Sequence, residues 1–239
     1  MPELVTLHVW RVPTRGVPAA ITRMAADRAH LRRTSGLRFT KSLGTGDGRT
    51  FTVRDADPRR WALLCAWESA AAARSFELGS PVVRAWARLA IETCRLDLRP
   101  VAARGRWSGR TPFGDPRTSA GARAAAGPRY AGPVAALTRA RLAPARAASF
   151  WRSVPPVSAD LRATPGLRLA LGVGEAPIGL QGTFSVWDDA AALRAFAYGR
   201  EAHTAVVART ASEGWYAEEL FARFAIAGVA GSIDGVCPA

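Results

Sequence analysis

The stretch WESAAAARSF at residues 67–76 recurs as WDDAAALRAF at residues 187–196, which is 120 positions later. A second string, TSGLR at residues 34–38, recurs as TPGLR at residues 164–168, and there the shift is 130 positions. The first copy therefore carries ten extra residues, in the polar stretch around residues 44–60. Because loops tolerate such changes in length, the sequence predicts two copies of one folding unit.

Each copy shows the same order of predicted elements. A strand opens the copy, a helix follows, and the Thr-x-Gly-Leu-Arg string leads into a second strand. A third strand ends at the tryptophan of the repeated stretch, and a second helix begins near Ser69 or Asp189, which are common N-cap residues. A last strand completes a β-α-β-β-α-β unit, which is the ferredoxin-like pattern. One face of each such sheet is bare. We therefore expect an α+β fold of tandem ferredoxin-like repeats packed sheet to sheet, and the alternative is that each half pairs with another subunit.

These repeats divide the chain into four predicted parts. An N-terminal repeat covers residues 1–101, a connecting segment rich in Arg, Gly and Pro covers residues 102–131, and a C-terminal repeat covers residues 132–230. Residues 231–239 are expected to form a frayed tail. The connecting segment contains Trp107, and flexible linkers rarely carry bulky aromatic residues. We therefore predict a lid that folds over the mouth of a pocket, with a solvated linker as the alternative.

The composition excludes several classes of protein. The 239 residues carry a formal net charge of +14, and Lys41 is the only lysine. Because the arginines are spread along the whole chain and form no recognition motif, nucleic-acid binding is not expected. No window approaches 18 uninterrupted apolar residues, so no integral membrane segment is expected. Three cysteines without C-x-x-C spacing and a start without a signal peptide predict a cytoplasmic protein without disulfides.

One histidine breaks the repeat. At the shift of 120 positions, His203 replaces Val83 on a helix face that also carries Val206 and Val207, so it is predicted to point inward. One interpretation is a buried histidine that is hydrogen-bonded to the backbone. The other is a ligand that points into a cavity. No second histidine lies near His203 in the sequence, so a site with two or three histidines is poorly supported, whereas haem needs only one axial histidine.

Two further strings carry a family resemblance. WYAEELFARF at residues 215–224, preceded by His203, and RGRWSG at residues 104–109 resemble the spheroidene monooxygenase family. The resemblance implies a dimeric α+β barrel related to the small antibiotic-biosynthesis monooxygenases. The named member of the spheroidene monooxygenase family oxidises a carotenoid methylene with O2. The resemblance also implies haem, with His203 as the proximal ligand of the iron. The string YGREA at residues 198–202 departs from the family pattern, which leaves the shape of the pocket and the substrate open.

The sequence thus predicts a haem-dependent monooxygenase that oxidises a hydrophobic or natural-product substrate with O2 and electrons from a donor. His203 is the predicted metal ligand, and the other predicted cofactor-binding residues are Arg106, Trp107, Phe196 and Trp215. Arg106, the arginine of this set, would pair with a haem propionate. The alternatives are a haem-dependent dehydratase or peroxidase-like enzyme of the same fold, a cofactor-free barrel monooxygenase, and a non-catalytic haem-binding protein. A homodimer is a further expectation.

Overall fold

The structure is a computed structural model of the whole chain, and it describes residues 1–47, 55–114, 130–175, 180–199, 209 and 213–239. The elements of the first half are β1 (Leu4–Arg11), α1 (Val17–Arg32), β2 (Leu37–Gly46), β3 (Ala56–Trp67), α2 (Ala70–Gly79), α3 (Pro81–Leu89) and β4 (Glu92–Gly105). The elements of the second half are β5 (Val134–Leu142), α5 (Ala147–Arg162), β6 (Leu167–Gly174), β7 (Leu180–Trp187), α6 (Ala190–Gly199) and β8 (Tyr216–Gly231). Short 3-10 turns at Thr14–Gly16 and Pro144–Arg146 precede α1 and α5.

The eight described strands form one antiparallel sheet that closes into a barrel in the order β1-β3-β2-β6-β7-β5-β8-β4. The two seams between the halves differ in length. β4 and β8 pair from Cys94–Gly231 to Gly105–Leu220, whereas β2 and β6 pair only from Gly44–Gly174 to Gly46–Gly172. The mixed α+β class predicted from the sequence is therefore confirmed, and a single chain closes the barrel.

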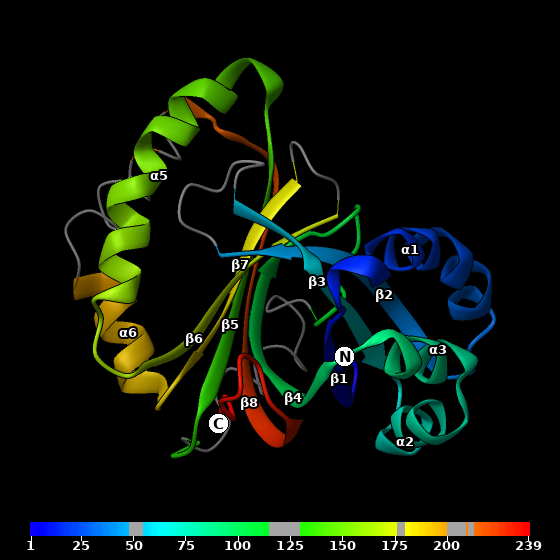
Figure 1. Cartoon of the computed structure of the whole chain (residues 1–239). Helices are drawn as coiled ribbons and strands as arrows, with labels where there is room; N and C mark the ends of the chain where they lie inside the picture. The colour runs from blue at the N-terminus through cyan, green and yellow to red at the C-terminus, as the bar shows by residue number, and fades with distance from the viewer. Residues whose placement is uncertain (48–54, 115–129, 176–179, 200–208, 210–212) are drawn as a thin grey trace.

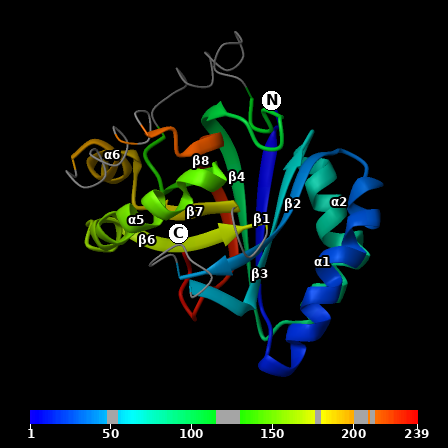
Figure 2. The same ribbon diagram turned by 90° about the horizontal axis from the view of Figure 1, so that it is seen from above.

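Alternation along the strands fills the barrel with side chains. In β1, for example, Val5, Leu7 and Val9 belong to a core to which all eight described strands contribute, whereas Trp10 packs outside the barrel under the helices. Figure 2 shows α1 and α2 on one side of the barrel and α5 and α6 on the other. Because the interior is packed, a ligand site has to be sought in the layers between the sheet and the helices.

Each half ends in a short turn that closes one end of the barrel. Gly105 at the end of β4 and Gly231 at the end of β8 have φ values of +87° and +89°, where glycine is favoured. A Cβ at these positions would lie 2.2 and 2.0 Å from a backbone carbonyl oxygen of the neighbouring strand. The chain then forms a one-bridge hairpin whose first residue, Trp107 or Ile233, enters the barrel core.

A carboxylate holds each of these hairpins. Two successive backbone N–H groups, of Ser108 and the next residue, donate to Glu218 at 3.0 and 2.8 Å. The N–H groups of Asp234 and its successor donate to Glu92 in the same way, at 3.1 and 2.7 Å. The two barrel ends are thus sealed by the same device, which nothing in the sequence analysis had indicated.

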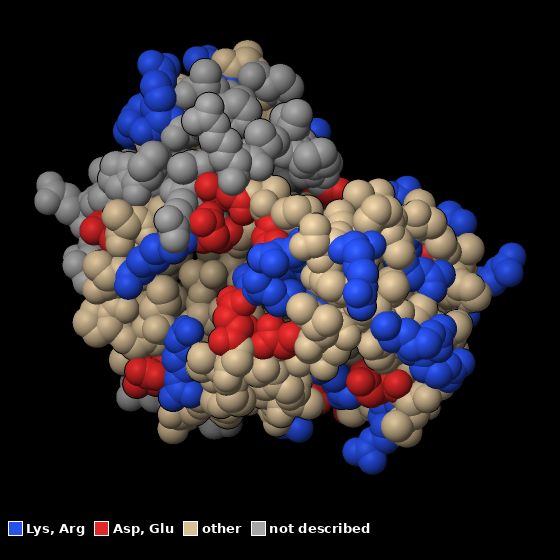
Figure 3. All heavy atoms as spheres, in the orientation of Figure 1, with Lys and Arg blue, Asp and Glu red and all other residues tan. Residues whose placement is uncertain are grey.

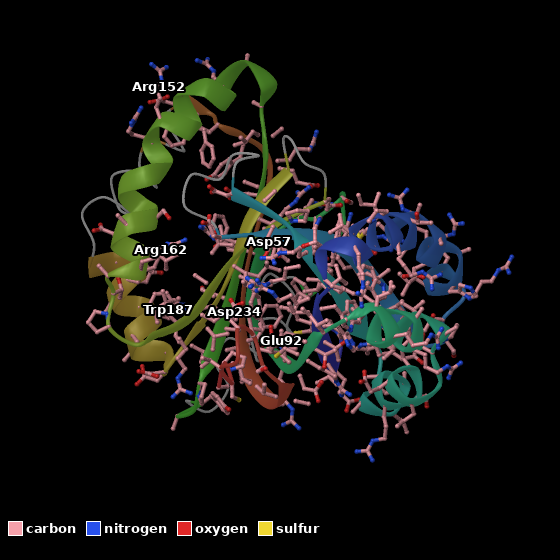
Figure 4. The ribbon with its side chains drawn as sticks, in the orientation of Figure 1. Asp57, Glu92, Arg152, Arg162, Trp187 and Asp234 are labelled. Atoms are coloured by element: carbon pink, nitrogen blue, oxygen red, sulfur yellow. The ribbon has the colours of Figure 1, made fainter. Side chains whose placement is uncertain are left out.

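The predicted boundaries change at both hairpins. Residues 231–239, expected to form a frayed tail, contribute side-chain contacts in the structure, because Asp234 accepts two hydrogen bonds from Arg60 at 2.6 and 2.7 Å, in addition to the contacts with Glu92. Figure 4 shows Asp57, Glu92 and Asp234 close together at this end of the barrel. Of the connecting segment predicted at residues 102–131, the first four residues belong to β4, and residues 115–129 lie outside the described residues.

Charged side chains of both signs share the surface of the protein. On the face shown in Figure 3, groups of Lys and Arg side chains alternate with groups of Asp and Glu side chains and are separated by uncharged surface. Several arginines are neutralised locally, such as Arg95 by Asp97 at 2.8 Å and Arg209 by Glu213 at 2.6 Å. No helix in the described part of the chain is both long and apolar enough to cross a membrane.

Candidate functional site

The strand register allows the two halves to be compared residue by residue. Leu4 faces Trp67 across β1 and β3, and Val134 faces Trp187 at the same place across β5 and β7. Counting from these pairs, the outward pair His8–Leu63 of the first half corresponds to Thr138–Thr183 of the second. One step further, Trp10–Trp61 corresponds to Ala140–Gln181. Large residues in the first half are thus replaced by smaller ones in the second.

Aromatic side chains fill the layer between the sheet and the helices of the first half. His8 stacks on Trp10 with ring centroids 5.3 Å apart, and Trp10 stacks on Trp86 of α3 at 5.0 Å. Trp61 approaches Trp86 at 6.3 Å, and the indole N–H of Trp86 donates to Asp27 of α1 at 2.8 Å. We call His8, Trp10, Trp61 and Trp86 the aromatic plug. It joins β1, β3 and α3 and leaves no room there for a ligand.

Burial also determines the charge state of the plug. Desolvation, assisted by the positive charge of Arg95, lowers the pKa of His8 to about 3. His8 is therefore neutral at physiological pH and has a structural role in a closed layer. Burial likewise raises the pKa of Asp27, although the hydrogen bond from Trp86 and the charge of Arg23 oppose this effect.

The corresponding sheet face of the second half is less completely covered. Thr6, His8 and Leu63 are only 1%, 3% and 2% exposed, but their counterparts Ala136, Thr138 and Thr183 are half-buried. Ala170 on the adjacent strand β6 is also half-buried and lies on the same face, because Ser185 pairs with both Ala170 and Ala136. We call these four half-buried residues the open floor: Ala136, Thr138, Ala170 and Thr183. Their strands β5, β6 and β7 lie on the side of the barrel that carries α5 and α6 (Figure 1).

The helix above the open floor is itself unusual. α5 contains Pro155 and Pro156 in its interior, where α1 has Ala25 and Ala26. Proline has no N–H to donate to the carbonyl four residues earlier, so α5 lacks there the backbone hydrogen bonds that Ala25 and Ala26 can make in α1.

Two of the predicted cofactor-binding residues lie in the second half's layer. Phe196 of α6 stacks on Trp187 with ring centroids 5.4 Å apart, in a cluster against which Ala136 and Ala170 pack. Trp215 is fully buried just before β8, and its indole N–H donates to Ser149 of α5 at 2.8 Å. The edge of Phe150 approaches Trp215 at 5.7 Å, so this tryptophan anchors the start of α5.

The other two predicted residues belong to a barrel end. Trp107 is 1% exposed, lies in the core of the barrel, and donates a hydrogen bond to Glu175 at 2.5 Å. The guanidinium of Arg106 donates to the carbonyl of Gly109 within the same hairpin, at 2.9 Å. The structure therefore does not bring Arg106 and Trp107 together with Phe196. His203 lies outside the described residues.

A buried charge cluster around Trp107 escaped the sequence analysis. Lys41 of β2 forms an ion pair with Glu175, and Arg139 of β5 pairs with Glu218 and, at 3.3 Å, with Glu175. Burial raises the pKa of Glu218, but hydrogen bonds from two backbone N–H groups and from Arg139 outweigh it and lower the pKa overall. The available signal was the inward position of Lys41, two residues from Phe39 and from Leu43, both of which lie in the barrel core.

Metal ligands of the usual kind are not grouped in the described residues, where no cluster of three or more His, Cys, Asp or Glu could hold a metal ion. Burial raises the pKa of Cys65 in the first half's layer to about 12, and burial with the nearby Cys237 raises that of Cys94 in the barrel core to about 12. These two thiols are therefore protonated and inert.

A solved structure of another protein shares the fold. The chain shares its fold with a solved aldoxime dehydratase, at a TM-score of 0.61 and 11% identity, over 93% of this chain and 80% of that one. This likeness concerns the fold alone. No protein-family model matches the sequence.

Sequence relatives identify the family. The chain is 37% identical to spheroidene monooxygenase of Rhodobacter capsulatus over 94% of this chain and 90% of the relative. It is 40% identical to spheroidene monooxygenase of Rubrivivax gelatinosus over 84% of this chain and 72% of that relative. The chain therefore belongs to the spheroidene monooxygenase family and is an oxidoreductase, as the resemblance in residues 104–109 and 215–224 predicted.

Proposed function

We propose that the chain is a haem-dependent monooxygenase that oxidises a hydrophobic substrate with O2, and that the haem iron is held by His203 in the layer above the open floor. The observation that carries the proposal is the difference between the halves. The same layer is filled by the aromatic plug in the first half, whereas in the second half the counterparts of three almost fully buried residues are only half-buried. His203 belongs by sequence to the open half.

We further infer that the halves are two copies of one ferredoxin-like unit, joined in one chain as the equivalent of a dimeric α+β barrel. The matching registers of β1–β3 and β5–β7 support this inference, as does the strand order, which is β4-β1-β3-β2 in one half and β8-β5-β7-β6 in the other. The twin hairpins after β4 and β8 add independent support. In this interpretation one copy keeps the barrel stable and the other holds the site.

The residues present fit a haem with one axial histidine. The chain has three histidines, of which His8 is packed in the plug and His30 is exposed on α1, which leaves His203 for the iron. The thiols of Cys65 and Cys94 are buried elsewhere and protonated. The open floor offers methyl groups and hydroxyls without a charged side chain, which suits a flat apolar macrocycle and a hydrophobic substrate.

The chain's own residues would have separate roles. When bound, haem supplies the redox-active iron that oxygenation with O2 and an electron donor requires. Phe196 and Trp215 form walls of the layer, whereas we now assign Arg106 and Trp107 to the seal of the barrel end. The open floor orients the substrate and excludes water from its apolar part. Because the barrel interior is packed, the substrate enters from the helix side.

An absorption spectrum tests the cofactor directly. Protein expressed with haem supplied should show a Soret band, and His203→Ala should lose or shift it. His30→Ala is the matched control, because His30 is exposed on α1 and should leave the spectrum unchanged. No Soret band in the wild type, or an unchanged band in His203→Ala, refutes the ligand assignment. A colourless protein that still oxygenates its substrate would instead be a cofactor-free monooxygenase.

A further inference from the structure

We propose that Thr138 and Thr183 are specificity-determining residues, whose small size decides how bulky a hydrophobic substrate can lie on the open floor. The proposal rests on the proposed function, because it places the substrate in the second half's layer. It adds which two side chains the substrate contacts and what would block it. The two threonines are direct partners across β5 and β7, so they form one continuous surface.

The first half shows what happens when this pair is large. There His8 and Leu63 occupy the same register position, are both almost fully buried, and support the packing of the aromatic plug. Exchange of both for threonine removes side-chain volume from the centre of the sheet face. Because protein interiors are packed as densely as crystals, the half-buried state of the threonine pair, against the almost complete burial of His8 and Leu63, indicates that protein side chains cover this face less completely. A hydrophobic ligand is the occupant that we propose for it.

The chemistry of the pair also differs from that of its neighbours. Ser185 accepts a hydrogen bond from the indole of Trp187 at 2.9 Å, and Thr6 accepts one from Trp67 at 2.9 Å, so these hydroxyls serve internal packing. Among the residues that the structure describes, the hydroxyls of Thr138 and Thr183 have no such partner. Each side chain therefore presents a methyl and an available hydroxyl. This surface suits an apolar substrate that carries a single hydrogen-bonding group.

The test restores the residue of the filled half. Thr183→Leu places at position 183 the leucine that the first half has at position 63. Ala170→Leu adds side-chain volume to the open floor independently, on β6. The probe is cis-parinaric acid, a conjugated tetraene whose fluorescence rises in an apolar site, titrated into the full-length protein. Each enlarged variant should bind the probe about tenfold or more weakly than the wild type, because excess volume in an apolar pocket is strongly rejected. The melting temperature should stay unchanged or rise, since the added side chain fills a space.

Two control variants separate size from other effects. Thr93→Leu makes the same substitution at an exposed position of β4 and should bind the probe as the wild type does. Thr183→Val keeps the size and removes only the hydroxyl, so it should retain binding within about threefold, or less than 1 kcal/mol. Wild-type affinity in both enlarged variants, a loss in Thr183→Val as large as in Thr183→Leu, or failure of the wild type to bind the probe would each overturn the proposal.

The probe titration and the haem spectrum test separate proposals, so either proposal can be refuted without the other. If the Soret band is absent but the enlarged variants still lose the probe, the floor is the binding surface and the cofactor assignment is wrong. If His203→Ala loses the Soret band but the enlarged variants bind the probe normally, the haem assignment stands and the role of Thr138 and Thr183 is refuted. With a substrate in hand, Thr183→Leu should raise KM more than it lowers kcat, because it removes binding of the substrate body.

Discussion

The two halves of the barrel share strand order, register and terminal hairpins, yet the layers outside their sheets differ. In the first half, stacked aromatic rings join β1, β3 and α3 into a closed core. In the second half, the same register positions carry threonine and alanine, and solvent reaches the sheet. Under the proposed function, the comparison teaches that the two halves of one barrel can separate their tasks, because a half relieved of binding can be packed for stability. The half that binds would leave its layer less completely packed.

This division predicts unequal costs of truncating an aromatic residue in the two layers. Trp86→Ala removes the ring that packs on Trp10 and Trp61, and it leaves Asp27 without its hydrogen-bond donor. We expect a loss of about 3–5 kcal/mol in the free energy of unfolding, measured by urea denaturation. Phe196→Ala in the second half should cost less, about 2 kcal/mol, because Phe196 stacks on the ring of Trp187 and its neighbours Ala136 and Ala170 are only half-buried.

Equal losses in the two variants would contradict the comparison. They would mean that the second half's layer is as tightly packed as the first, and that the half-exposure of Thr138 and Thr183 does not reflect usable space. The slope of the denaturation curve is the internal check, because a variant that changes stability alone keeps the wild-type slope.

The repeat in the sequence was sufficient to predict the mixed α+β class and the order of the strands, but the single helix predicted after the third strand of the first half is two helices, α2 and α3. The strings at residues 67–76 and 187–196 fall at corresponding ends of β3 and β7, as expected from local pattern. The barrel-end hairpins escaped prediction, because they depend on glycines with positive φ and on a carboxylate from a strand distant in sequence. Aligning the two halves of the sequence already pairs His8 with Thr138. This difference can be interpreted only when the strand register shows which face of the sheet the two residues lie on.

The seals at the two barrel ends allow a second comparison. Glu218→Gln removes the charge that faces Arg139, whose side chain is only 5% exposed, and weakens the hold on the Trp107 hairpin. Glu92→Gln acts on the other hairpin, where its partners are a serine hydroxyl and two backbone N–H groups. We expect losses of about 2–3 kcal/mol for Glu218→Gln and about 1 kcal/mol for Glu92→Gln in urea denaturation.

The pH dependence of the unfolding free energy tests whether Glu218 and Glu92 hold the two hairpins. Burial raises the pKa of each carboxyl, but the hydrogen bonds from the hairpins outweigh it, so both pKa values are lowered from 4.5. The unfolded chain then binds protons more readily than the folded one, so this stability is complete above pH 4.5 and declines as the pH falls. Each Gln variant should lose its share of that acid dependence, and a variant with the wild-type acid profile would show that its carboxylate does not hold the hairpin.

His8 predicts a pH effect that belongs to the first half alone. Its pKa is lowered from 6.5 to about 3, so protonation favours the unfolded chain between these values. The unfolding free energy should therefore fall as the pH drops below 6.5, with a limiting slope of about 1.4 kcal/mol per pH unit, and His8→Leu should lack this component. Urea denaturation at several pH values measures it. His30→Leu, at an exposed position, should keep the wild-type slope, and a wild-type slope in His8→Leu would refute the assignment.

The smallest expected effects distinguish the two hairpin turns. Ser108 and Asp234 occupy the same turn position with φ values of 53° and 54°, so glycine should relieve similar backbone strain of about 1 kcal/mol in each. Ser108→Gly gives up one hydrogen bond from Lys41, at 2.7 Å, and should leave stability within about 0.5 kcal/mol of the wild type. Asp234→Gly gives up two charged hydrogen bonds from the buried Arg60 and should be destabilised by about 1 kcal/mol. Asp234→Gly also gives up an ion pair with Arg11. Because the strain relief cancels between the variants, their difference measures how far the Arg60 and Arg11 contacts of Asp234 together exceed the Lys41 contact of Ser108, and equal stabilities would show that they add nothing beyond it to the seal.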